Sequence, residues 1–155
     1  MTKKIAVLFS GSGTNLENLF LKLHNKTFNG TKIEIALTIC NKEGAAGIDK
    51  SRKYGVNPVI LKHSDYPQRE EFDKKLTEII KAANVDLCVL AGFMRILTPY
   101  FTQNVKAINI HPSLLPLFKG SDAVHKSYAA NTKEAGASVH FVNEELDGGE
   151  LILQK

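Results

Sequence analysis

The sequence has few arginines and no long apolar run. Only Arg52, Arg69 and Arg95 stand among scattered lysines, and no basic block is interleaved with aromatic residues, which argues against nucleic-acid binding. No stretch reaches the length of a membrane span, and residues 1–9 lack the apolar region and cleavage site of a signal peptide. We therefore expect a cytoplasmic protein that binds neither nucleic acid nor membrane.

Cysteine is also scarce. Cys40 and Cys88 lie in apolar, strand-like segments, without a CxxC pair or a histidine at ligand spacing. We expect two buried free thiols in a reducing compartment. Because His24, His63 and His125 share no ligand spacing either, we predict no metal site.

The composition is that of an ordinary globular domain. The chain has 155 residues, of which 43% are hydrophobic and 23% charged, so neither a disordered nor a fibrous protein is indicated. No internal repeat or linker divides it, and we expect one domain over residues 1–155. The formal net charge of +4 would favour encounters with phosphates and carboxylates.

Strand-like and helix-like patterns alternate along the chain, which predicts a doubly wound α/β fold with a mostly parallel sheet. The expected strands are residues 3–9, 33–40, 58–61, 85–91, 105–110, 138–142 and 151–153. The first expected helix follows residue 15, and others cover residues 45–54, 99–103 and 122–131. A further helix is expected to begin at Pro67, with an apolar stripe of Phe72, Leu76, Ile79 and Ile80.

Residues 109–116 are the part of the chain best suited to chemistry. Asn109 and His111 stand at the carboxyl end of an apolar strand, and Pro112 and Pro116 prevent further ladder pairing. Open α/β sheets bind their ligands at this edge. Asp147 precedes two glycines after another strand; if it reached His111 it would favour the charged imidazole expected of a general acid. The alternative is a simple hairpin-like turn.

A second candidate site lies between the first strand and the first helix. In Gly11-Ser12-Gly13-Thr14-Asn15, backbone N–H groups and hydroxyls would converge on the positive end of the helix and hold a phosphate. The pattern is not a complete GxGxxG, because Leu16 occupies the third glycine position. A phosphate monoester therefore fits better than a dinucleotide. The alternative is a tight turn whose glycines serve the backbone only.

Three other residues have open interpretations. Arg95 is an isolated charge just past a strand, so it must be paired, exposed or directed at a ligand. His140 lies between Val139 and Phe141 in a strand, and we expect a structural role for it. Ser113 lacks a nucleophile elbow, which disfavours hydrolase chemistry of that type.

Taken together, four segments resemble the phosphoribosylglycinamide formyltransferases, within the wider group of folate-dependent formyltransferases. They are residues 10–16, 90–97, 109–116 and 138–149, in the family's order and spacing. The resemblance implies a Rossmann-like formyltransferase fold. It also implies transfer of a formyl group from 10-formyltetrahydrofolate to N1-(5-phospho-D-ribosyl)glycinamide in purine biosynthesis, by direct attack and without a metal, in a monomer or homodimer.

The resemblance assigns roles by position. His111 would act as an acid toward the tetrahedral intermediate, Asn109 would hydrogen-bond the formyl oxygen, and Asp147 would orient and charge His111. The implied substrate-binding residues are Gly11, Ser12, Gly13, Thr14 and Asn15. The implied folate-binding residues are Arg69, Met94, Arg95, Ile96, Leu97, Asn109, Asn143, Glu144, Glu145 and Leu146.

The chain departs from the family pattern in two places. Residues 117–125 replace a proline-glycine and closely spaced histidines, so we expect a different loop but the same chemistry. Family members continue past the position of Lys155 through a strand and a long helix, so we expect a C-terminally truncated domain with one sheet face bare. The alternative functions are another folate-dependent formyltransferase, a formyltetrahydrofolate hydrolase, or an inactive folate-binding fragment.

Overall fold

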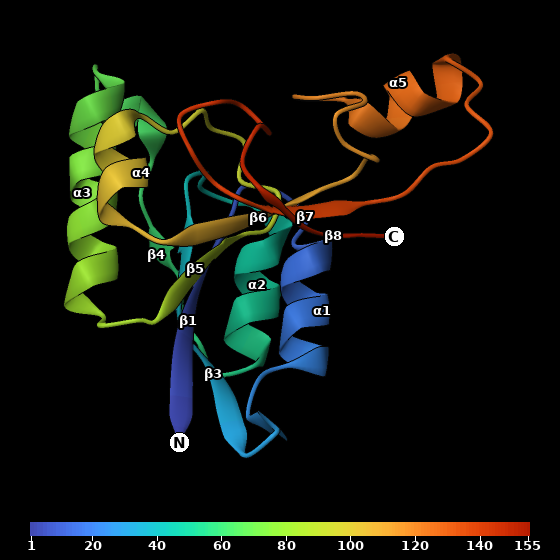
Figure 1. The fold of residues 1–155 in the computed structure, drawn as a ribbon. Coiled ribbons are helices and arrows are strands. Elements are labelled where there is room, and N and C mark those ends of the chain that lie inside the picture. Colours follow the sequence, from blue (N-terminus) through green and yellow to red (C-terminus); the bar gives the residue numbers. More distant parts are fainter.

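One eight-stranded sheet with helices on both faces organises the protein in a computed structural model, which describes residues 1–155 (Figure 1). The strands are β1 (Thr2–Phe9), β2 (Lys26–Phe28), β3 (Thr31–Cys40), β4 (Val59–Ile60), β5 (Leu87–Leu90), β6 (Ala107–His111), β7 (Ser138–Phe141) and β8 (Leu151–Gln154). The helices are α1 (Thr14–Lys22), α2 (Ala46–Lys53), α3 (Arg69–Ala82), α4 (Pro99–Asn104) and α5 (Ala123–Ala129), with a short 3₁₀ helix, η1 (His63–Asp65).

The strand order is β2-β3-β1-β5-β6-β7-β8, and β4 also pairs with β3. β1 is parallel to β3 on one side and to β5 on the other, and β5 is parallel to β6. The antiparallel pairs are β2 with β3, β6 with β7 and β7 with β8. The predicted doubly wound, mostly parallel sheet is confirmed. Because β1, β5 and β6 are parallel, their carboxyl ends meet at one edge of the sheet. The strand order reverses at β1, and sheets of this class bind their ligands at such a point of that edge.

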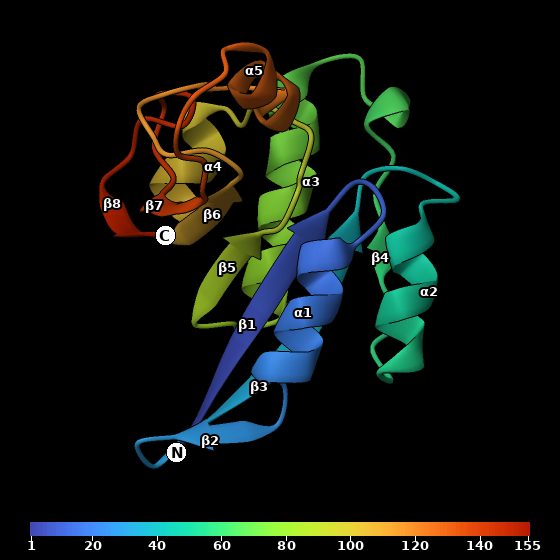
Figure 2. The same ribbon diagram turned by 90° about the vertical axis from the view of Figure 1, so that its right-hand side faces the viewer.

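The alternation of side chains along β1 builds a separate core on each face of the sheet. Ala6 and Leu8 belong to one buried cluster, with Phe72 and Leu76 of α3 and Phe101 of α4. The other face packs against α1 and α2, and its buried cluster is Ile5, Val7, Phe9, Leu16, Phe20, Ile35, Cys40, Ile48, Val89 and Ala91 (Figure 2). Both faces of β1 are therefore buried, as expected of a central parallel strand.

The structure differs from the expected elements in two places. Strand β2 was not predicted, and it pairs with β3 through a two-residue turn in which Asn29 and Gly30 have positive φ angles of 47° and 79°. Asn-Gly is the residue pair that such a turn favours. Pro67 was expected in the first turn of a helix, but α3 begins at Arg69, because Gln68 is still extended with φ −119°.

Strand β8, at one edge of the sheet, is exposed along its whole length. Leu151, Ile152 and Leu153 of β8 are 45%, 48% and 63% exposed. Helix α5 projects beyond the sheet rather than packing on a face of it (Figure 1), and Tyr128 on it is 88% exposed. None of the helices combines the length and the apolar character needed to cross a membrane.

Candidate active site

A buried acid and a buried histidine meet at the carboxyl end of β6. His111, the last residue of β6, lies with Nδ1 3.5 Å from Oδ2 of Asp147, and their side chains are 6% and 7% exposed. The same Oδ2 accepts a hydrogen bond of 2.7 Å from the backbone N–H of Gly120. The structure thus brings His111 and Asp147 together, a contact that the sequence alone did not establish.

Asn109 joins this pair from the same strand. Its Nδ2 lies 3.3 Å from Oδ1 of Asp147 and 3.1 Å from Nε2 of His140. Since Nδ1 of His140 lies 2.8 Å from the carbonyl oxygen of Phe141, that nitrogen is the donor and Nε2 accepts from Asn109. Both N–H donors of the Asn109 carboxamide are therefore engaged, one by a carboxylate and one by an imidazole.

His140 is a member of the site that the sequence analysis did not include. It is 2% exposed and faces Asn109 across the β6–β7 ladder, where the two residues are direct partners. The alternation of His140 with Val139 and Phe141 was visible in the sequence. What could not be read there is that β7 pairs antiparallel with β6 in this register. His140 therefore belongs to the cluster through its contact with Asn109.

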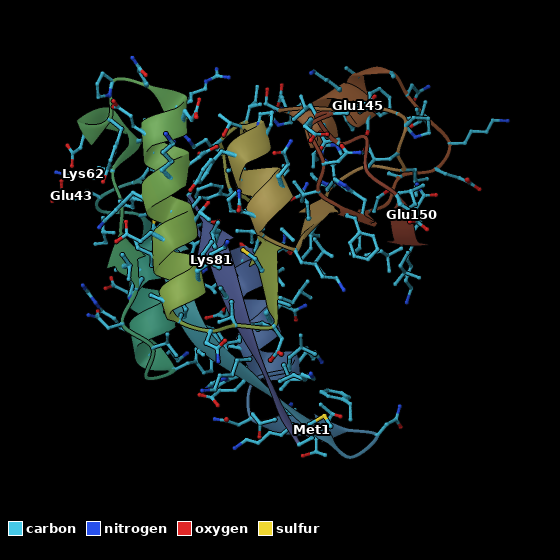
Figure 3. All side chains as sticks on the ribbon, turned by 60° about the vertical axis from the view of Figure 1, so that its left-hand side comes forward. Met1, Glu43, Lys62, Lys81, Glu145 and Glu150 are labelled. Carbon is cyan, nitrogen blue, oxygen red and sulfur yellow. The ribbon has the colours of Figure 1, made fainter.

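A cleft opens beside the cluster. Its lining residues are Leu90, Phe93, Arg95, Ile96, Leu97, Asn109, His140, Val142, Asn143, Glu144, Glu145, Leu146 and Asp147. All the expected folate-binding residues line it except Arg69 and Met94, of which Met94 is 65% exposed. Glu145 lies at the opposite end of the molecule from Met1 (Figure 3), in keeping with a cleft at the carboxyl ends of the parallel strands.

The loop after β7 brings Asp147 into the cluster through an unusual backbone. Asp147 has a positive φ of 51°, and the Asn143 side chain accepts a 2.9 Å hydrogen bond from the N–H of Glu145. A Cβ atom on Gly149 would overlap the carbonyl oxygen of Phe141. Gly149 is therefore required because the backbone of the loop approaches β7 closely, and not only because a turn favours the conformational freedom of glycine.

Arg95 is paired. Its Nε lies 3.5 Å from Oδ1 of Asp73, a residue of α3 whose side chain is fully buried. Arg69 enters the site only through its carbonyl oxygen, 3.3 Å from Nη2 of Arg95. Asp73 was missed because it stands within the apolar side of an amphipathic helix, and nothing local in the sequence shows which charge it faces.

The loop between β1 and α1 lies on the same sheet edge. Ser12, Thr14 and Asn15 are exposed there, and Gly13, with φ 74°, precedes the first turn of α1. A Cβ on Gly13 would lie 2.7 Å from Cα of Gly47 in α2, so both glycines allow the two helices to approach closely.

Ser10, just before this loop, connects it to the cleft. Its hydroxyl accepts a 2.8 Å hydrogen bond from the N–H of Met94 and donates one of 2.5 Å to Oδ1 of Asn41. Its N–H also donates to the carbonyl oxygen of Gly92 at 3.1 Å. The loop and the Gly92–Met94 segment are thus held at a fixed distance from each other.

The segment after Pro116 folds over His111. The carbonyl oxygen of Phe118 lies 2.8 Å from Nε2 of His111, and Lys119 makes an exposed ion pair with Glu145 at 3.4 Å.

No group of three or more histidine, cysteine, aspartate or glutamate side chains gathers as a metal site would.

Known proteins resemble the chain over almost all of its length. Residues 3–155 match the family described as formyl transferase. The crystal structure of phosphoribosylglycinamide formyltransferase from Campylobacter jejuni superimposes with a TM-score of 0.98 at 57% identity, over 100% of this chain and 82% of that one. The curated phosphoribosylglycinamide formyltransferase of Haemophilus influenzae is 40% identical over 154 residues, which are 98% of this chain and 71% of that protein.

Longer relatives contain the same region as a small part. The trifunctional purine biosynthetic protein adenosine-3 of Homo sapiens is 40% identical over 98% of this chain, which spans 15% of that protein. The match of the family over residues 3–155 and the superposition on the Campylobacter jejuni structure agree with the fold described above. The chain belongs to the formyl transferase family, and phosphoribosylglycinamide formyltransferases are among its relatives there.

Proposed function

We propose that this protein transfers a formyl group from 10-formyltetrahydrofolate to the amine of N1-(5-phospho-D-ribosyl)glycinamide. The observation that carries the proposal is the buried cluster of Asn109, His111 and Asp147 beside an open cleft, on the same sheet edge as the β1–α1 loop. The family uses small-molecule substrates and folate-derived formyl donors. Relatives with 40% and 57% identity bear the name of this reaction.

The formyl donor would occupy the cleft. Its walls are the Arg95–Leu97 segment on one side and the Asn143–Leu146 loop on the other, with Leu90 and Val142 adding apolar surface. A flat heterocycle could lie between the two segments and hydrogen-bond their backbone groups. This placement would bring the formyl group to Asn109 and Asp147, the polar residues that line the cleft next to the buried His111.

The phosphate of the ribonucleotide would bind at the β1–α1 loop. The first N–H groups of α1 have no partner within the helix, and the dipole of its nine residues favours an anion at this end. The hydroxyls of Ser12 and Thr14 lie 3.3 Å apart and are both exposed. They can add hydrogen bonds to the phosphate without any rearrangement of the core.

The chemistry would need a positioned acid and no covalent enzyme intermediate. The glycinamide amine attacks the formyl carbon, the bond from that carbon to the folate nitrogen breaks, and one proton passes from the amine to the folate nitrogen through His111. Asp147 balances the charge that His111 carries, and Asn109 faces the formyl oxygen as it gains negative charge.

Two contacts must change before these steps. Nε2 of His111 faces the carbonyl oxygen of Phe118, so this part of the loop has to shift if that nitrogen is to meet the reactants. Similarly, an N–H of Asn109 has to be shared between the formyl oxygen and its partner in the cluster. Both changes are local, because neither Phe118 nor the Asn109 carboxamide belongs to the two packed cores.

Turnover measured with each substrate omitted in turn tests the proposal. The purified protein is mixed with the ribonucleotide and 10-formyltetrahydrofolate, and the deformylated folate is followed by its absorbance. We expect turnover only when both are present. Turnover without the ribonucleotide would indicate a hydrolase, and turnover with an aminosugar nucleotide in its place would indicate a different formyltransferase.

A further inference from the structure

We infer that Asp73, which does not line the cleft, positions the cleft wall formed by Arg95, Ile96 and Leu97 and so sets the affinity for the formyl donor. The inference rests on the proposed function, since it assigns to this wall the contact with the donor. Asp73 would be a positioning residue, because it acts on the ligand only through the segment that it holds.

Asp73 binds one end of the wall with two hydrogen bonds. Its Oδ2 accepts 2.6 Å and 2.7 Å hydrogen bonds from the N–H and the hydroxyl of Thr98. Thr98 is the residue that precedes the first turn of α4, and its own side chain makes no capping hydrogen bond to that helix. The hydroxyl of Thr98 is thus directed to Asp73, and the carboxylate fixes where the wall ends and α4 begins.

The other oxygen of Asp73 faces the opposite end of the wall. Oδ1 lies 3.5 Å from Nε of Arg95, and neither of these two buried atoms has a hydrogen-bond partner. The guanidinium of Arg95 also lies 3.9 Å from the ring centroid of Phe72, and the Arg95 side chain is only 12% exposed. The charge of Arg95 therefore faces Asp73 and the ring of Phe72.

Between these two ends stand Ile96, which is 49% exposed, and Leu97, which is 8% exposed. Both line the cleft, whereas Asp73 does not. One carboxylate therefore contacts both ends of a short segment whose middle lines the cleft. A shift of about 1 Å in such a segment is enough to change binding or rate by orders of magnitude.

Stability alone does not account for a carboxylate at this position. A buried ion pair contributes little to stability compared with apolar residues of similar volume, because both charges lose their hydration. Here the pair is long, at 3.5 Å, and two of its atoms are without partners. A site on the apolar side of α3, next to Phe72 and close to Leu76, would be filled more favourably by an apolar side chain. The role left for Asp73 is to hold residues 95–98 in their observed positions.

The Asp73→Asn variant tests the inference, because it keeps the size of the side chain and an oxygen for Thr98 but removes the charge that faces Arg95. Steady-state kinetics on the full chain give KM for each substrate and kcat. We expect KM for 10-formyltetrahydrofolate to rise about tenfold, with KM for the ribonucleotide and kcat changed by less than about twofold.

Leu76→Ala is the matched control. Leu76 is fully buried in the same helix and belongs to the core cluster that contains Phe72, but it takes part in no hydrogen bond or ion pair with Thr98 or Arg95. It should lower the melting temperature and leave KM for the formyl donor unchanged well below that temperature. An unchanged KM in Asp73→Asn, or an equal rise in Leu76→Ala, would overturn the inference.

A double-mutant cycle with Arg95→Met asks whether Asp73 acts through Arg95. If it does, the second substitution adds little to the KM of the first, whereas independent effects would multiply and contradict the inference. If Asp73→Asn does not fold, Thr98→Val removes one of the two Thr98 hydrogen bonds and should raise the same KM by a smaller factor. A wild-type protein without turnover would refute the proposed function instead, so the two failures are distinguishable.

Discussion

At the scale of single residues, Asp147 is the centre of the candidate site. It faces His111 at 3.5 Å and His140 at 3.6 Å, and it accepts hydrogen bonds from Asn109 and from the N–H of Gly120. A carboxylate that is 7% exposed needs such partners, because a buried charge without them would be strongly destabilising. One side chain thus sets the orientation of three others.

Asp147→Asn should nearly abolish turnover. The variant removes the negative charge opposite His111, and its amide N–H would face either the N–H of Gly120 or that of Asn109. We expect kcat to fall roughly 10²–10³-fold, the range seen when one preorganised electrostatic contact is lost. The folate absorbance assay measures it. Glu150→Gln, an exposed change just after the same loop, should retain full activity, and a similar loss there would contradict the assignment.

His24 gives the protein a predicted pH dependence of stability. Its Nδ1 accepts a 3.0 Å hydrogen bond from the backbone N–H of Ile35, so the ring must be unprotonated at that nitrogen. Burial lowers the pKa of His24 below its usual 6.5, while Glu34 opposes and Lys32 adds to this effect. The unfolded chain therefore takes up the proton first as the pH falls.

The contribution of His24 to the free energy of unfolding should accordingly be present in full above pH 6.5. It should decrease below pH 6.5, as His24 in the unfolded state becomes protonated. For one proton the slope cannot exceed about 1.4 kcal/mol per pH unit. Urea melts between pH 5 and pH 8, compared with those of His24→Asn, isolate this contribution. Asparagine offers an acceptor near the position of Nδ1 and does not titrate. Parallel curves for the two proteins would contradict the prediction.

At the scale of elements, the approach of α1 to α2 sets the shape of the predicted phosphate loop. The backbone N–H of Gly47 in α2 donates a 3.0 Å hydrogen bond to the carbonyl oxygen of Gly11, which links α2 directly to that loop. The loop can only keep its shape if α2 stays close.

Gly47→Ala should destabilise the protein and weaken ribonucleotide binding. Helix propensity favours alanine by up to about 1 kcal/mol, but the new Cβ would lie 2.6 Å from the ring of the fully buried Phe9. Overpacking of this kind costs about 1–3 kcal/mol, so the net effect should be a loss. Urea melts and calorimetric titration with the ribonucleotide measure both effects. Gly11→Ala is the control for stability, because a Cβ on Gly11 would have no heavy atom within 4 Å. This variant should unfold at the same urea concentration as the wild type.

Most elements could be predicted from the sequence because their signals are local. The apolar run of β5 and the helical stripe of α3 follow directly from burial on one or both faces. The strand β2 had a local signal, Asn29-Gly30, but its three residues are all exposed and show no apolar alternation. Asp73 and His140 had no usable local signal, since their partners, Arg95 and Asn109, are brought to them only by packing and strand register.

At the scale of the whole molecule, the sheet separates two cores, and each contains one thiol. Cys88 belongs to the cluster under α3 and α4, and Cys40 to the cluster under α1 and α2. Burial raises the pKa of both thiols, and the Cys40 thiol also donates to the carbonyl oxygen of Lys42 at 3.1 Å. The expectation of two buried free cysteines is confirmed.

Thiol labelling should therefore report separately on the opening of the two cores. Because the thiolate is the reactive form, we expect an aromatic disulfide reagent to modify the folded protein more than about a hundredfold more slowly than the urea-unfolded chain. Cys40→Ser and Cys88→Ser assign the two rates to the two faces. Rapid labelling of either thiol in the folded protein would show that its core opens readily.

Because β1 lies in the middle of the sheet, the nascent chain cannot pair both edges of this strand early in synthesis. It precedes the other strands of this sheet along the chain, yet its partners are β3, which ends at Cys40, and β5, which begins at Leu87. One edge of β1 must therefore stay unpaired until β5 has left the ribosome, and the pairing of His111 with Asp147 comes later still. During that interval an apolar strand with a free edge is open to association with other chains, so synthesis is the time at which this protein most needs a chaperone.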